Sequence, residues 1–204
     1  MIKLYHIPRT RSVRIIWLLE ELGLDYEVEV LTGDTKSAPA FLKISPFGKV
    51  PAIEDGDLVL TESVAIVQYI LSEYGQGRLH PPVDSKEYAQ FLQWLNFGES
   101  TLMQPIAEVI VNKLFRPEEH KHQFSIDNGT KNFSDMARVI DGVLANSDYL
   151  VGDAFTAADI VTGYSLNVAD MLGLISETDG IAHLRDYIDR LRSREAFKKI
   201  ADYN

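Results

Sequence analysis

The chain of 204 residues contains no cysteine. This absence excludes disulfide bonds, thiolate metal ligands and any mechanism in which a protein thiol attacks a substrate. Cations are also scarce, because 20 Lys and Arg residues stand against 30 Asp and Glu residues, which gives a formal net charge of −10. A protein this acidic is not expected to bind nucleic acid or an anionic membrane surface.

Long apolar runs are missing as well. No stretch approaches the ~20 apolar residues that a membrane-spanning helix needs. The first residues, MIKLYHIPRTR, lack the apolar core of a signal peptide. With 46% apolar and 25% charged residues, the composition is that of an ordinary globular protein. We therefore expect a soluble, cytoplasmic protein.

The first part of the chain alternates between strand and helix patterns. β-Favouring residues in Ile2–His6 predict a strand, and Val13–Leu22 carries apolar residues at helical spacing. Charged and apolar residues alternate in Tyr26–Leu31, which predicts a second strand, and a short helix is expected around Ala38–Ile44. A strand–helix–strand start favours parallel pairing through a right-handed crossover. An α/β domain is therefore expected here.

The clearest break in the sequence combines Gly75-Gln76-Gly77 with Pro81-Pro82. We place the domain boundary at Leu79–Ser85, which gives a first domain of residues 1–79 and a second of residues 86–204. Beyond the break only helix patterns occur, so the second domain is expected to be all-α. Its expected helices are Lys86–Leu114 with bends at Gly98 and Pro105, Asp127–Ala145, Ala157–Leu172, Ile181–Arg192 and Glu195–Asp202.

The stretch from Ser45 to Tyr69 combines several local signals. Pro51 cannot donate a hydrogen bond to a strand ladder, so it should stand just before a strand, Ala52–Glu54. A hairpin turn and a returning strand, Leu58–Leu60, follow. A helix that begins at Glu62-Ser63 directs free backbone N–H groups and a positive dipole end toward a ligand. This helix start is therefore a candidate carboxylate site.

The same stretch resembles the glutathione-binding half of the glutathione S-transferase family. In that family a Val followed by a cis-Pro pairs its backbone with the cysteinyl part of glutathione, and the matching residues here are Val50 and Pro51. A Glu-Ser pair that opens the next helix holds the γ-glutamyl end, a role that falls to Glu62 and Ser63. The order of elements is similar to the family's thioredoxin-like α/β domain followed by a helical one. The resemblance therefore covers essentially the whole chain.

Two lysines match further ligands of the family. Lys36 lies fourteen positions before Val50, a spacing similar to that of a basic ligand for the glycine carboxylate in theta-like members. Lys49, directly before Val50, would be a second such ligand. The alternative for both is a solvated surface lysine, which is the usual environment of lysine. Positive charge beside glutathione would attract the anion and lower its thiol pKa.

The family activates the thiol with a Tyr at the end of the first strand, or with a Ser or Cys at the start of the first helix. This chain offers Tyr5, Thr10 and Ser12. Counted back from Arg14, Thr10 stands where theta-like members place their serine. Counted forward from Pro8, Ser12 falls one place past the beta-class cysteine. We rank Ser12 before Thr10, since serine is less hindered than a β-branched residue, and Tyr5 last.

The resemblance implies a glutathione transferase. Such an enzyme binds glutathione in the first domain, lowers its thiol pKa and directs the sulfur at a small hydrophobic electrophile. Glutathione is then the cosubstrate, no metal is needed, and a homodimer is typical. The alternatives are a non-catalytic glutathione-binding protein of the same fold, a glutathione-dependent peroxidase and a glutathione-dependent isomerase. The isomerase class carries a Ser-Ser-Cys cluster, which a chain without cysteine lacks.

Two further patterns are expected to be structural. Thr156 and Asp159 have the spacing of a capping box, in which each side chain satisfies a backbone donor at the start of a helix. His120 and His122 could form a metal pair, but no further ligand stands near them in the sequence. We therefore expect a helix cap at the first pair and a solvated loop at the second.

Overall fold

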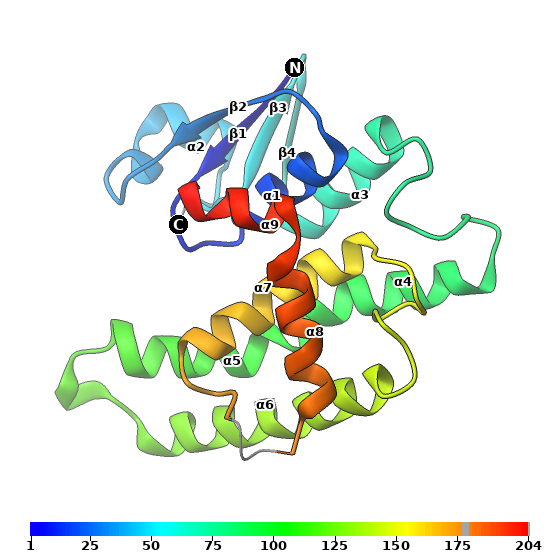
Figure 1. Ribbon diagram of the computed structural model, residues 1–204. Helices are drawn as coiled ribbons and strands as arrows, with labels where there is room; N and C mark the ends of the chain where they lie inside the picture. Colours follow the sequence, from blue (N-terminus) through cyan, green and yellow to red (C-terminus); the bar gives the residue numbers. More distant parts are fainter. Residues whose placement is uncertain (177–179, 204) are drawn as a thin grey trace. The chain divides into compact units, whose positions relative to one another are not determined.

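The computed structural model describes residues 1–176 and 180–203 (Figure 1). Contacts within the chain group Met1–His80 and Ser193–Asn204 into one compact unit and Pro81–Arg192 into another. The grouping changes from one unit to the other after His80. The segment that begins at Ser193, which we expected in the helical domain, makes its contacts in the first unit.

The first unit contains a four-stranded sheet with the strand order β2-β1-β3-β4. β1 (Ile2–His6) runs parallel to β2 (Tyr26–Val30), as the expected crossover requires. On its other side β1 is antiparallel to β3 (Ala52–Asp55), which forms a hairpin with β4 (Leu58–Thr61). The predicted α/β class of this domain is therefore confirmed, with strand ends shifted by one residue.

Three α-helices lie within residues 1–80, all of which the structure describes. α1 (Val13–Leu22) ends at Gly23, whose φ of 64° is in the left-handed region that favours glycine. α2 (Pro39–Ile44) has proline at its first position, where a missing N–H leaves no hydrogen bond unmade. α3 (Ser63–Tyr74) begins where the sequence predicted, and it packs against α1.

Side chains of β1 point alternately to the two faces of the sheet. Leu4, which is paired with Ile53 of β3, has no exposed surface. Tyr5 points to the opposite face, where its ring lies 5.3 Å from that of Phe41 in α2. One face of the sheet is therefore covered by α2, and the other is left to α1 and α3 (Figure 1).

The end of the chain packs on α1. α9 (Glu195–Lys199) brings the ring of Phe197 edge-on to Trp17, with 4.9 Å between the ring centroids. Just before α9, Arg194 donates two hydrogen bonds to the carboxylate of Glu21, at 2.6 and 2.8 Å. These contacts explain why the last residues belong to the first unit by their packing.

The second unit is built from helices, which confirms the predicted all-α class. The long helix expected from Lys86 is divided, because π-helical turns follow both α4 and α5. The elements are α4 (Lys86–Asn96), a π turn (Phe97–Thr101), α5 (Met103–Ile110), a second π turn (Val111–Phe115), a 3-10 turn (Glu118–His120), α6 (Gln123–Leu144), α7 (Ala157–Met171) and α8 (Ala182–Ser193).

Two glycines allow helices of this unit to approach closely. A Cβ added at Gly98, in the first π turn, would lie 2.9 Å from the backbone N and Cα of Thr162 in α7. A Cβ added at Gly129 in α6 would lie 2.9 Å from the carbonyl oxygen of Pro105 in α5. α6 begins at Gln123, four residues before the predicted start, and continues through Gly129 because this packing offsets the low helix propensity of glycine.

Most of α7 is buried, since every residue from Ala157 to Leu166 is buried. The predicted capping box at its start is present. The carboxylate of Asp159 accepts hydrogen bonds from the backbone N–H of Thr156 at 2.8 Å, from the backbone N–H of Leu150 at 3.0 Å and from the Tyr187 hydroxyl at 2.8 Å. Burial raises the pKa of Asp159, and these donors act in the opposite direction. Asp159 therefore ties α8 and the preceding loop to α7.

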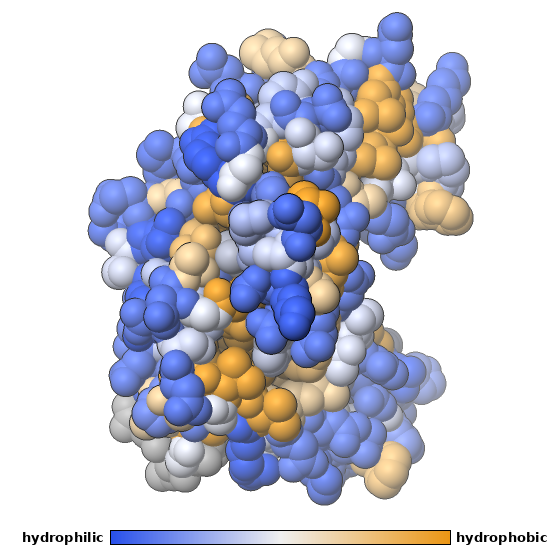
Figure 2. Space-filling view, turned by 90° about the vertical axis from the view of Figure 1, so that its right-hand side faces the viewer, coloured by the Kyte–Doolittle hydropathy of each residue, from blue (hydrophilic) through white to orange (hydrophobic). Residues whose placement is uncertain are grey.

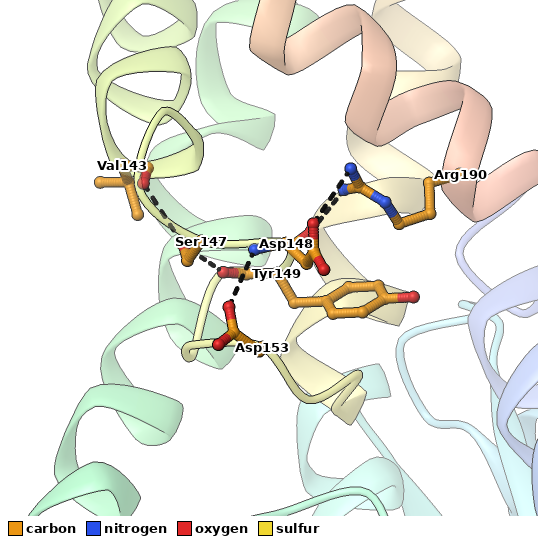
Figure 3. Close-up of polar contacts among 6 residues, drawn as sticks. All are labelled: Val143, Ser147, Asp148, Tyr149, Asp153 and Arg190. Atoms are coloured by element: carbon orange, nitrogen blue, oxygen red, sulfur yellow. Dashed lines mark hydrogen bonds and ion pairs between the residues drawn. The ribbon is translucent and has the colours of Figure 1, made fainter.

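The loop before α7 is closed by polar contacts (Figure 3). The Ser147 hydroxyl donates to the carbonyl oxygen of Tyr149 at 2.9 Å, and the backbone N–H of Asp148 lies 3.4 Å from the carboxylate of Asp153. Arg190 extends from α8 to the carbonyl oxygen of Asp148 at 2.6 Å. These side chains have structural partners, so we assign the loop to the scaffold.

The surface agrees with the composition. Figure 2 shows a face that is mostly hydrophilic, with apolar residues gathered in smaller patches between polar ones. None of the helices in the described part of the chain combines the length and the apolar character that a bilayer crossing requires.

Replacing Gly98 with Ala should destabilise the protein. The new methyl group would meet the backbone of Thr162, so the π turn and α7 must move apart, at a cost of about 1–3 kcal/mol in the free energy of unfolding. Gly142→Ala is the matched control, because the added methyl group would meet nothing within 4 Å beyond its own helix turn, and Ala should stabilise this exposed helix site by up to about 1 kcal/mol. Urea unfolding measures both values, and equal stability of the two variants would contradict the close packing.

Candidate active site

The peptide bond between Val50 and Pro51 is cis, as predicted. The loop that precedes it is closed by Ser45, whose hydroxyl donates to the carbonyl oxygen of Lys49 at 2.8 Å. A Cβ added at Gly48 would lie 3.3 Å from the carbonyl oxygen of Lys36. The backbone segments that carry the two predicted lysine ligands therefore lie next to each other, and both lysines are exposed.

The start of α3 has a strained backbone. Glu62 stands at the N-cap position with φ 70° and ψ 112°, in a region that L-residues other than glycine rarely adopt. A conformation of this kind costs of order 1–3 kcal/mol and is most often found at ligand-binding sites. Glu62 is exposed, whereas Ser63 is buried at the first helical position.

A buried cation holds this helix start. Arg14 of α1 has no exposed surface, and its guanidinium donates to the Ser63 hydroxyl oxygen at 3.0 Å. The Ser63 oxygen accepts this bond, so its own hydrogen remains available to an acceptor. In the sequence, Arg14 served only as the reference position from which Thr10 was counted. The two partners are 49 positions apart in the sequence, so no local pattern marks this contact.

Thr10 and Ser12, the two predicted helix-side hydroxyls, lie together. Their oxygens are 2.7 Å apart. Ser12 has no exposed surface, and its oxygen is also 2.8 Å from Nδ1 of His6. Thr10 is half-buried, and its hydroxyl donates to the carbonyl oxygen of Ile7 at 2.7 Å. Ser12 stands at the N-cap position of α1, but its side chain does not cap the helix.

His6 is the residue that the sequence did not point to. It is 1% exposed, and its Nε2 lies 2.8 Å from the carbonyl oxygen of Tyr203. Burial lowers the pKa of His6, and the hydrogen bond to Tyr203 acts weakly in the other direction. A histidine at the end of an apolar strand has no sequence pattern that distinguishes it from a core residue.

Tyr5, the third candidate, lies apart from these hydroxyls. It points to the α2 face of the sheet and is 6% exposed. Its hydroxyl donates to the carboxylate of Glu54 at 3.0 Å. Burial, and then this hydrogen bond, raise the pKa of Tyr5. The tyrosine is therefore held in its neutral form within the scaffold.

The described residues contain no group of three His, Cys, Asp or Glu side chains that could hold a metal ion. His120 and His122 are both exposed, as expected of a solvated loop. Nδ1 of His122 pairs with the hydroxyl of Ser125 at 3.1 Å.

Comparisons with known proteins agree on one family. The family model for the N-terminal domain of glutathione S-transferase matches residues 1–72, and the model for the C-terminal domain matches residues 102–195. Glutathione S-transferase 3 of Zea mays is 36% identical over 177 residues, which cover 78% of this chain and 73% of the relative.

Two solved structures are similar in fold. The glutathione transferase URE2P6 of Phanerochaete chrysosporium, in complex with oxidized glutathione, has a TM-score of 0.88 at 26% identity and covers 98% of this chain and 94% of its own. The theta class enzyme of Xanthomonas axonopodis pv. citri, with glutathione bound, has a TM-score of 0.83 at 27% identity. The match covers 97% of this chain and 95% of that chain.

The sheet and its helices fit a thioredoxin-like N-terminal domain, followed by the helical C-terminal domain that the second family model describes. Glutathione is the cosubstrate of enzymes with this pair of domains, and structural neighbours were crystallised with it. Because the two models together match more than half of the sequence, this chain belongs to the glutathione S-transferase family.

Proposed function

We propose that this glutathione transferase binds reduced glutathione at the cis-proline loop and the start of α3, and that the sulfur attacks a small hydrophobic electrophile. The start of α3 is the observation that carries the proposal. Glu62 keeps a strained backbone, and Ser63 is held by the buried Arg14. A strained helix start beside a buried cation suits a ligand that brings both an ammonium group and a carboxylate.

In the proposed pose the γ-glutamyl end of glutathione lies at the start of α3. The exposed carboxylate of Glu62 would accept hydrogen bonds from the ligand ammonium group. The Ser63 hydroxyl, which accepts from Arg14, would donate to the ligand carboxylate together with the free N–H groups of the first helical turn. The positive charge of Arg14 would further stabilise that carboxylate.

The remaining contacts follow the cis-proline loop. The backbone of Val50 would pair with the cysteinyl part of glutathione, and Pro51 in its cis form sets the direction of that backbone. Lys36 and Lys49 would bind the glycine carboxylate. Both lysines are exposed, and the backbone segments that carry them lie next to each other, which supports this role.

We assign the activating hydroxyl to Thr10 in preference to Ser12. Ser12 has no exposed surface, and its hydroxyl is engaged with His6 and Thr10. Thr10 is the more exposed of the pair, and it stands just before the positive end of α1. We rank Tyr5 last, because its hydroxyl bonds Glu54 on the α2 face and its pKa is raised. Donation from Thr10 would stabilise the thiolate and so lower the thiol pKa of bound glutathione.

We further propose a cytoplasmic homodimer, as is typical of the family. Peroxide reduction and isomerisation use the same thiolate, and a non-catalytic protein would bind glutathione without turnover. A panel of aryl halides, epoxides and hydroperoxides distinguishes conjugation from peroxide reduction and from binding without turnover. Analytical sedimentation of the same protein measures the mass of the proposed dimer. Turnover of an electrophile with loss of free thiol is the expected result.

Ser63→Ala or Glu62→Ala should weaken glutathione binding by more than tenfold, which corresponds to about 1.4 kcal/mol or more. Each change leaves a charged group of the ligand without its partner in a partly desolvated site. Calorimetric titration measures the affinity. Ser72→Ala, at an exposed position of the same helix, is the matched control and should bind like the wild type. Unchanged affinity in both test variants would remove the proposed pose.

Thr10→Val should raise the thiol pKa of bound glutathione by about 1–2 units, because a hydrogen bond to a charged sulfur is lost. Ultraviolet titration of the bound thiolate measures this pKa. Thr10→Ser should restore the low value, and Tyr5→Phe should leave it unchanged because the Tyr5 hydroxyl bonds Glu54. If Tyr5→Phe alone raised the pKa, tyrosine would be the activating residue. If neither Thr10→Val nor Tyr5→Phe did, backbone donors and the buried Arg14 would activate the thiol without a side-chain hydroxyl.

A further inference from the structure

The ring of His6 has one possible arrangement of its hydrogen when it is neutral. Its Nε2 lies 2.8 Å from the carbonyl oxygen of Tyr203, and a carbonyl oxygen can only accept. Nε2 therefore carries the hydrogen. Burial lowers the pKa of His6, so the ring is neutral at pH 7 in the free protein. Nδ1 is then an acceptor, with its lone pair directed at Ser12.

This tautomer sets the direction of the next two hydrogen bonds. Ser12 has a single hydroxyl hydrogen, and the contact of 2.8 Å to Nδ1 of His6 requires it. In the contact of 2.7 Å between Thr10 and Ser12, the hydrogen must therefore come from Thr10. The Thr10 hydroxyl can donate to Ser12 or, at the same 2.7 Å, to the carbonyl oxygen of Ile7. The donors thus run in one direction, from Thr10 through Ser12 to His6.

The chain of donors joins a half-buried oxygen to a buried base. Thr10 is the more exposed end, and its oxygen keeps a lone pair for a further donor. The other end is the neutral Nδ1 of His6, whose ring is held in place by the carbonyl oxygen of Tyr203. A base oriented by a third group is the arrangement that activates nucleophiles in many enzymes. Ser12 itself has no exposed surface, so it cannot be the nucleophile.

We propose that Thr10, Ser12 and His6 form a proton relay that takes the thiol proton of bound glutathione, with Nδ1 of His6 as the final acceptor. This inference rests on the proposed function and on the role of Thr10 in it. His6 and Ser12 are positioning residues, because they act on the thiol through Thr10.

The transfer is balanced in atoms and electrons. The S–H bond breaks and its proton passes to the Thr10 oxygen, the Thr10 hydrogen passes to Ser12, and the Ser12 hydrogen passes to Nδ1 of His6. The electron pair stays on sulfur as the thiolate, and no co-reactant is needed. Each hydrogen bond then points the other way, so that His6 donates to Ser12, Ser12 to Thr10, and Thr10 to the thiolate.

The relay makes the charge of His6 depend on the ligand. Burial disfavours a charged imidazole in the free protein, whereas a nearby thiolate favours it. The carbonyl oxygen of Tyr203 accepts from Nε2 in both states and so stabilises the imidazolium. Proton uptake by His6 is therefore expected only when a ligand with an ionisable thiol occupies the site.

Nuclear magnetic resonance of ¹⁵N-labelled histidine tests the relay directly. The chain has five histidines, and His6→Asn assigns the signal of His6. In the free protein Nδ1 should be unprotonated, and saturating glutathione should protonate both ring nitrogens. S-Methylglutathione, which lacks the thiol proton, should leave the ring neutral. A neutral His6 ring in the glutathione complex would overturn the relay.

Kinetics supply a second test. In His6→Asn the amide oxygen can still accept from Ser12 but cannot take a proton, so kcat/KM should fall by about 100-fold, the scale of general base catalysis. Affinity for S-methylglutathione should be unchanged. Ser12→Ala should likewise lower kcat/KM and leave this affinity unchanged. His122→Asn is the control, because it also removes a histidine paired with a serine, at an exposed site.

The outcomes separate the two proposals. Wild-type kcat/KM in His6→Asn would refute the relay alone, provided that this variant binds S-methylglutathione. Failure of the wild-type protein to bind either ligand would refute the proposed glutathione site and the relay with it.

Discussion

The position of β1 in the sheet is the constraint on which the first unit depends. β1 pairs with β2 on one side and with β3 on the other, so its side chains must alternate between the two faces. Tyr5 is thereby committed to the α2 face and bonded to Glu54, while its neighbour His6 contacts Ser12 at the start of α1. The separation of the candidate tyrosine from the candidate hydroxyls on opposite faces of the sheet therefore follows from the alternation of one strand.

Charge placement at the start of α3 depends on a second long-range contact. This acidic chain buries Arg14 completely and uses it to hold the hydroxyl of Ser63. A buried guanidinium is costly unless it has partners, so the arrangement depends on the packing of α1 against α3. The strained backbone of Glu62 persists because the packed elements around it hold it in this conformation. Packing thus supplies the energy that holds this candidate site in an unfavourable local geometry.

The helical unit shows how a buried ionisable group is stabilised by partners from its own unit. Asp159 is as buried as Arg14, but its carboxylate accepts hydrogen bonds from Thr156, Leu150 and Tyr187, all within the same unit. The site is complete, and it links α7, α8 and the loop between α6 and α7. A buried carboxylate with several donors is a scaffold element, whereas a helix start with free N–H groups is able to accept a ligand.

Local signals let the sequence alone determine much of this protein. The helix start at Ser63 and the capping box at Asp159 depend on neighbours within a few residues, so spacing was enough to predict them, whereas the cis peptide at Pro51 was predicted from the resemblance to the family. The tertiary structure alone decided the environment of the hydroxyls. The partners of Ser12 include a histidine on another element, and that histidine is oriented by Tyr203, 197 residues further along the chain. The burial of a side chain and the tautomer of a histidine depend on the residues packed around it, and no sequence pattern encodes contacts across such separations.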